Sequence, residues 1–190
     1  NQSTVLINQL AQLDAQRDAV KIELMSSNEI LNQYKNEIKK QNPQLVEYLE
    51  NQTSQVYLNV LQKQIAELQV NRDISVANNS PNAGVQSKIQ ELEKKITELK
   101  EKLSALINDI KAEAFASSPE QIRDLTQKLI QEEINNNSLS IKFKELQSII
   151  SQYERDLNRF PETTIELAQY QRKKESHQQL YLLIDQKYQE

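Results

Sequence analysis

The side chains that could carry chemistry are few in this sequence, and their spacing does not gather them into a site. His177 is the only histidine and there is no cysteine, which leaves no thiol chemistry and no cysteine-based metal site. Adjacent acids such as Glu132 and Glu133 point to different sides of a helix and are badly placed to act as a catalytic pair. We therefore expect a non-enzymatic protein without catalytic, cofactor-binding or metal-binding residues.

Arg172 is the side chain best suited to a specific contact, because a guanidinium can bind a carboxylate through two parallel hydrogen bonds. We expect it to pair with an acid on a neighbouring protomer or on a domain that is absent from this sequence. The alternative is a solvated arginine on a helix surface. The neighbouring Lys173 and Lys174 belong to one of several short basic runs flanked by acids, a pattern typical of solvated helix faces.

The composition indicates long helices. The 190 residues include one glycine, 37% hydrophobic residues and 26% charged residues, with a net charge of −4. The shortage of glycine disfavours tight turns and strand hairpins and excludes a glycine-rich phosphate loop. An acidic chain without a basic stripe is not expected to bind nucleic acid.

The ends of the sequence indicate a segment of a longer protein, since it starts at Asn1 without methionine and stops within a predicted helix at Glu190. It has no run of 18 apolar residues and no signal peptide. We therefore expect membrane contact only through segments absent from this sequence.

Heptad seams fill most of the chain and are divided by prolines. Apolar residues recur at steps of three and four through the first 42 residues, where Arg17 and Ser27 stand at skipped positions, and again through 85–110 and 122–160. Asn42 before Pro43 and Ser118 before Pro119 are cap signals that predict new helices. The polar run 51–54 predicts a weak point in the second helix.

The spacing of the prolines predicts the fold. Pro43 and Pro119 each lie 38 residues from Pro81, so the two breaks face each other if the chain forms one antiparallel hairpin. We predict an all-α fold in which residues 1–160 form an extended helical hairpin, with kinks near Pro43 and Pro119 and a tip near 78–84. Each arm would reach about 120 Å. The alternative is an up-and-down helical bundle, which requires wider apolar faces.

Two polar residues, Glu132 and Asn136, interrupt the seam of the fourth helix. One interpretation is that they fix the register of the helices at a cost in stability. The other is a loosely packed, water-filled seam.

The final segment, 161–190, departs from the seam. A different stripe of aliphatic and aromatic residues appears there, at Leu167, Tyr170, His177, Tyr181, Ile184 and Tyr188. We expect a connecting helix that packs against something other than the hairpin, toward a membrane-proximal part absent from this sequence.

These last 30 residues resemble the segment that closes the periplasmic region of bacterial polysaccharide co-polymerases, the Wzz-type chain-length determinants and their exopolysaccharide-export relatives. The matching positions are Pro161, Glu166, Arg172, Tyr181, Lys187 and Glu190. The sequence departs from the family pattern at Tyr170, where leucine is usual, and at Thr164, where an acid is common.

The resemblance implies a periplasmic scaffold within an inner-membrane-anchored homo-oligomer that controls the length or export of a surface polysaccharide. Its partners would be the polysaccharide polymerase or an outer-membrane export channel. Some relatives carry a cytoplasmic tyrosine autokinase, which nothing in this sequence resembles. The interaction candidates are Pro161, Glu166, Arg172 and Tyr181 from the motif and Pro81 at the hairpin tip.

Two other functions fit a helical hairpin. One is the adaptor of a secretion or efflux pump, whose tip docks onto an outer-membrane channel, although no β segment flanks the helices here. The other is a cytoplasmic coiled-coil tether. Membrane helices before Asn1 and after Glu190 would favour the co-polymerase.

Overall fold

The chain is built from helices. The computed structural model describes residues 2–77, 83–158 and 162–189, and these contain no strand. The helices are α1 (Gln2–Gln41), α2 (Pro43–Thr53), α3 (Val56–Ala77), α4 (Ala83–Ser117), the 3-10 turn η1 (Glu120–Ile122), α5 (Arg123–Leu157) and α6 (Glu162–Gln189). The predicted all-α class is confirmed.

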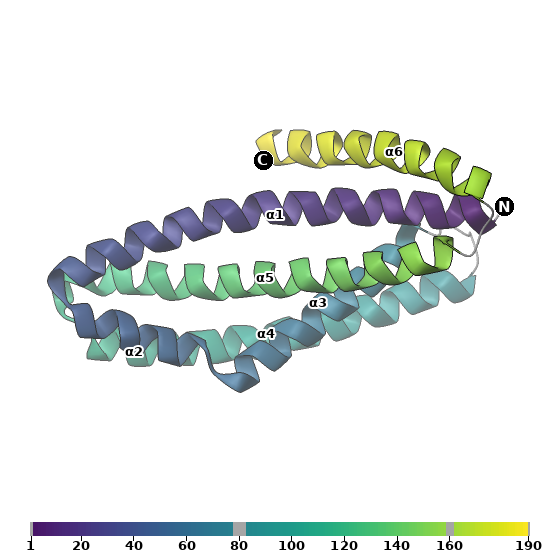
Figure 1. Ribbon diagram of the computed structural model, residues 1–190. Helices are drawn as coiled ribbons and strands as arrows, with labels where there is room; N and C mark the ends of the chain where they lie inside the picture. The colour runs from purple at the N-terminus through teal and green to yellow at the C-terminus, as the bar shows by residue number, and fades with distance from the viewer. Residues whose placement is uncertain (1, 78–82, 159–161, 190) are drawn as a thin grey trace.

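The arrangement is the second of the two predicted ones, an up-and-down bundle (Figure 1). The expected hairpin pairings are kept, since α1 packs along α5 and α3 along α4. However, the chain reverses at Pro43 and Pro119 instead of kinking, so α3 also packs on α5. The extended shape is therefore corrected to a hairpin doubled over, and α1, the longest helix at 40 residues, spans about 60 Å.

The apolar face of α5 explains the reversal. Leu129 and Ile130 are both fully buried, and Ile134 lies one turn further on. Adjacent buried positions widen a helix face beyond the two positions per heptad that a two-stranded seam uses. Gln62 of α3 donates a hydrogen bond to the Ile134 carbonyl oxygen at 2.9 Å, a contact that an extended hairpin would not allow.

The first reversal follows the predicted chemistry. Asn42 is the N-cap of α2, with its side-chain oxygen accepting from the Leu45 N–H at 3.3 Å, and Pro43 occupies the first turn. The Asn42 side chain thus pairs one of the N–H groups that a helix start leaves without a partner, and Pro43 has no N–H group to pair.

The second reversal is built differently from the prediction. Ser118 does not cap the next helix, because its hydroxyl donates backward to the Ala114 carbonyl oxygen at 2.7 Å. The chain passes through η1 before α5 begins at Arg123. The cap predicted at Ser118 is therefore wrong. A buried serine at the end of a helix can equally well bond to the preceding turn.

The weak point predicted at 51–54 is the place where the second helix is interrupted. The helix ends at Thr53, and α3 begins at Val56. Asn59 donates to the Ser54 carbonyl oxygen at 3.3 Å. A side chain therefore replaces part of the helical hydrogen bonding across the break.

The core consists of two apolar clusters. The first lies near the two reversals and includes Ile38, Leu49, Leu58, Ile122 and Leu129. The second lies toward the start of α1 and includes Leu10, Leu13, Val70, Leu146 and Ile150. Buried polar side chains of α1, α3 and α5 separate the two clusters.

Helix α6 begins at Glu162 and lies along α1 (Figure 1). It turns the small side chains of Ala168 and Ser176 inward. Four of its larger apolar side chains are exposed: Leu167, Tyr170, Tyr181 and Leu182. Tyr170, His177 and Tyr181 of the predicted stripe are thus exposed, whereas Ile184 is half-buried. The expectation that this helix packs against something other than the hairpin is wrong, because α6 packs along α1. None of the described helices combines the length and apolar character needed to cross a lipid bilayer.

Candidate functional site

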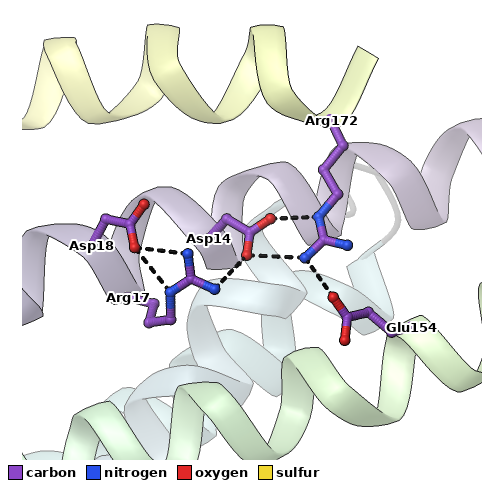
Figure 2. Close-up of polar contacts among 5 residues, drawn as sticks. All are labelled: Asp14, Arg17, Asp18, Glu154 and Arg172. Carbon is purple, nitrogen blue, oxygen red and sulfur yellow. Dashed lines mark hydrogen bonds and ion pairs between the residues drawn. The ribbon is translucent and has the colours of Figure 1, made fainter. Parts of the chain in front are cut away.

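The most concentrated group of charges joins α6 to the bundle, and we call it the Asp14 cluster. It consists of Asp14, Arg17 and Asp18 of α1, Glu154 of α5 and Arg172 of α6 (Figure 2). Because three helices contribute, the sequence spacing alone could not reveal it.

Arg172 and Asp14 form the centre of the cluster. The guanidinium donates through Nε to Asp14 Oδ2 and through Nη2 to Asp14 Oδ1 at 3.0 Å. Nη2 also donates to Glu154 Oε1 at 2.9 Å. This two-pronged geometry is the strongest form of a side-chain ion pair, and it fixes α6 against both α1 and α5.

Arg17 completes the shell around Asp14. Its Nη1 donates to Asp14 Oδ1 at 3.0 Å, and its Nε and Nη2 donate to Asp18 Oδ1 at 2.9 and 2.7 Å. One carboxylate therefore accepts from two guanidinium groups on different helices. Arg17, which stands at a skipped position of the apolar seam, therefore pairs with Asp14 and Asp18 of the same helix.

The two central side chains of the Asp14 cluster are largely buried. The Asp14 side chain is 9% exposed and that of Arg172 is 16% exposed. Burial is the largest single effect on Arg172 and lowers its pKa, but the hydrogen bonds and charges of Asp14 and Glu154 together raise the pKa above its usual range. The cluster therefore stays fully charged on the arginine side across the physiological range.

The sequence-predicted residues are not gathered at this cluster. Arg172 does form the predicted two-pronged pair, but its acids belong to the same chain and not to a neighbouring protomer or a further domain. Glu166 and Tyr181 are exposed on α6. Pro81 and Pro161 lie outside the described residues.

A shallow cleft of about 360 Å³ runs beside the cluster, between α1 and α6, with Lys173, Ser176 and His177 on its α6 side. His177 is exposed. Within the described parts of the chain, no group of three or more His, Asp or Glu side chains could hold a metal ion.

A polar layer crosses the middle of the bundle, where the sequence had flagged Glu132 and Asn136. The Ser27 hydroxyl donates to Glu132, and Asn136 donates to Ser27 Oγ and Asn28 Oδ1 at 3.2 and 2.9 Å. These bonds join α5 to the skipped seam position of α1. Direct hydrogen bonds therefore occupy this part of the seam, as the register-fixing interpretation requires, while a depression lined by Asn136 opens beside it. The effect on register stays a prediction.

The layer continues toward α3 through residues that the sequence did not single out. Gln62 is 2% exposed, and its amide donates to the Ile134 carbonyl oxygen and to Ser138 Oγ at 2.9 and 2.7 Å. Asn137 donates to Gln62 Oε1 at 2.6 Å and to Asn59 Oδ1. Gln62 sits next to the seam residue Leu61, so only knowledge of a third packed helix could have identified it.

The end of this layer opens into a second depression, which we call the polar recess. It has a volume of about 210 Å³ and lies where α2 gives way to α3. The Lys35 ammonium lies 2.6 Å from Glu50 Oε1 and 3.1 Å from Glu133 Oε1, and the Thr53 hydroxyl donates to Glu133 Oε2 at 2.6 Å. Burial lowers the pKa of Lys35, but both carboxylates outweigh it and raise the pKa above 10.5.

The chain has no significant match among protein-family models, curated proteins or solved structures.

Proposed function

We propose that the chain is a non-catalytic scaffold segment of the polysaccharide co-polymerase type. In this proposal it lies in the periplasm, within a homo-oligomer anchored in the inner membrane, and helps set the length or export of a surface polysaccharide. The polymerase or an outer-membrane export channel would be its partner.

The observation that carries the proposal is the use of Arg172. The resemblance in 161–190 singles out this arginine, and in the structure it fastens α6 to Asp14 and Glu154. A motif residue that holds a helix in place has a physical reason to be part of a motif. The resemblance and the geometry thus meet at Arg172.

The outer face of α6 supports an assembly role. Tyr170 and Tyr181 are 77% and 71% exposed, and tyrosine is among the residues that contribute most to protein interfaces. Because the inner face is fixed by an ion pair and small side chains, the aromatic side chains are held outward. This arrangement suits contact with a further protein surface.

The adaptor alternative has less support from the bundle. An adaptor needs a tip that projects from the rest of the molecule, but the ends of α3 and α4 that flank residues 78–82 lie at the same end as the start of α1 (Figure 1). No particular feature of the bundle favours a cytoplasmic tether.

The test is the polysaccharide length profile of the source bacterium carrying variants of the complete protein. We expect Arg172→Glu to shift the profile and to weaken the oligomer measured by cross-linking, because it places a third acid beside Asp14 and Glu154. We expect the Tyr170→Ser and Tyr181→Ser double variant to have the same two effects while leaving the helical content unchanged.

Gln171→Ala on the exposed side of α6 is the matched control and should change neither readout. If Arg172→Glu and the double tyrosine variant both keep the wild-type length profile and the wild-type oligomer, the co-polymerase assignment is wrong.

A further inference from the structure

The polar recess is built differently from a packed helix interface. It lies beside the break between α2 and α3, so Ser54 and Gln55 leave a gap in the helical surface next to α1 and α5. Its wall includes Lys35, Glu50, Asn59, Glu133, Asn136 and Asn137. Six polar side chains from four helices thus converge on one small opening.

The base of the recess is held rigidly. The Glu133 side chain is 8% exposed and is fixed by Lys35 on one oxygen and by Thr53 on the other. Each carboxylate oxygen can accept more than one hydrogen bond. A buried carboxylate with preset geometry is the kind of group that orients a polar ligand.

Two asparagines that line the recess, Asn136 and Asn137, have side-chain oxygens that can accept further hydrogen bonds. The Asn136 amide nitrogen is used by Ser27 and Asn28, and the Asn137 amide nitrogen is used by Asn59 and Gln62. Among the described residues, the side-chain oxygens of Asn136 and Asn137 have no hydrogen-bond donor. With the Lys35 ammonium as a donor, the recess offers donors and acceptors in close alternation.

The charged side chains of the recess limit the class of ligand that it can bind. Glu50 and Glu133 outnumber Lys35, so an anion is disfavoured. A metal ion is disfavoured because the Lys35 ammonium already lies between the two carboxylates, at 2.6 and 3.1 Å. Neutral hydroxyl groups fit best, since each one donates and accepts at once. Leu31 adds an apolar contact at the wall.

The volume of the recess limits the size of the ligand that it can bind. Pockets for drug-sized ligands measure about 300–1,000 Å³, whereas the recess measures about 210 Å³. We propose that the recess binds a single neutral sugar unit, as one point of contact with a polysaccharide chain. The link to a polymer rests on the proposed function, whereas the binding of a sugar unit rests on the recess alone.

The test is a nuclear magnetic resonance titration of the purified 15N-labelled chain with D-glucose, D-galactose and N-acetyl-D-glucosamine. We expect at least one sugar to cause saturable shifts in the side-chain amides of Asn136 and Asn137 and in the backbone amides of residues 54–59. The expected Kd is on the order of 1 mM, as suits a shallow site with few contacts.

Glu50→Gln should weaken this binding at least fivefold, because it removes a charged acceptor at the rim of the recess. The Glu50 side chain is 47% exposed, so the substitution should leave the fold intact. Glu47→Gln is the matched control on the exposed side of the same helix and should bind as the wild type does. Spermidine and inorganic phosphate serve as competing probes.

The absence of saturable shifts with all three sugars overturns the proposal. Binding of only spermidine or only phosphate overturns it as well, since the recess would then be an ion-pairing site. Equal weakening by Glu47→Gln and Glu50→Gln would place the binding elsewhere and has the same consequence. Because this titration measures no assembly or chain length, its failure is distinct from failure of the scaffold proposal.

Discussion

The Asp14 cluster and the polar recess contain similar residue types but differ in how fully their hydrogen-bonding groups are paired. In the Asp14 cluster, two arginines surround one carboxylate, and both Asp14 oxygens are engaged. In the recess, a single lysine is shared by two carboxylates, and the side-chain oxygens of Asn136 and Asn137 accept no hydrogen bond from described residues. The first group closes a contact between helices, and the second leaves hydrogen-bonding capacity unused.

The difference teaches how to separate structural from binding roles in a helical bundle. A closed cluster contributes to stability, and losing one member leaves a buried charge without its partner. An open cluster contributes less to stability, because water satisfies its outer groups in the free protein. Substitutions should therefore affect unfolding strongly in the first group and weakly in the second.

The largest expected effect is that of Asp14→Asn, which removes the charge shared by Arg17 and Arg172. We expect a loss of about 3 kcal/mol in the free energy of unfolding, measured by urea denaturation followed by circular dichroism. Asp18→Asn, which affects only Arg17, should cost less than about 1 kcal/mol. Equal losses in the two variants would show that the cluster has no buried centre.

Gln62→Leu should have the next largest effect, because it deprives Ser138 and Asn137 of a buried partner. We expect a loss of about 1–2 kcal/mol in the same denaturation measurement. Gln64→Leu makes the same change at an exposed position of α3 and should stay within about 0.5 kcal/mol of the wild type. A neutral Gln62→Leu would argue against a polar layer that specifies register.

Alkaline pH should expose the contribution of Lys35. Its pKa is raised in the folded state, so its contribution is complete below about 10.5 and is lost as the pH rises through the folded-state value. We expect the stability advantage of the wild type over Lys35→Met, on the order of 1 kcal/mol near neutrality, to shrink toward zero above that pH.

Tyr153 loses a contribution in the same alkaline window, since burial foremost and the charge of Asp156 also raise its pKa. It is present in both proteins, so the difference between them isolates Lys35. A constant difference from neutral to alkaline pH would mean that the lysine acts through packing alone.

Glu50→Gln should have the smallest effect on folding. Its carboxylate lies at the rim, and we expect a loss below about 0.5 kcal/mol by urea denaturation. Loss of sugar binding without loss of stability would sharpen the contrast between the two groups. A loss as large as that of Asp14→Asn would place Glu50 in a closed cluster instead.

The helices themselves could be predicted from the sequence because their signals are local. Asn42 and Pro43 mark a helix start through cap chemistry, and the polar run ending at Ser54 marks an interruption. The pairing of α1 with α5 also followed from the equal spacing of Pro43 and Pro119 about Pro81. These features depend on contacts between near neighbours in sequence or between the two helices of one seam.

The sequence offered the bundle only as the alternative fold, and the partners within the two polar groups could not be predicted, since both depend on how a third helix packs. Ile130 and Ile134 look like flanking residues of a seam until α3 covers them. Arg172 was identified as a pairing residue from its guanidinium and the family resemblance, but its acid lies 158 positions away. No spacing rule connects residues so distant before the reversals at Pro43 and Pro119 are known.

The distribution of the two apolar clusters has a consequence for amide hydrogen exchange. Neither cluster contains a residue of α4 before Leu103, so the first half of this helix is held mainly by α3. Regions with few buried contacts open locally at a smaller free-energy cost than the whole domain. Amide protons of residues 85–100 should therefore exchange with solvent well before those of α5, whose opening requires both clusters to separate.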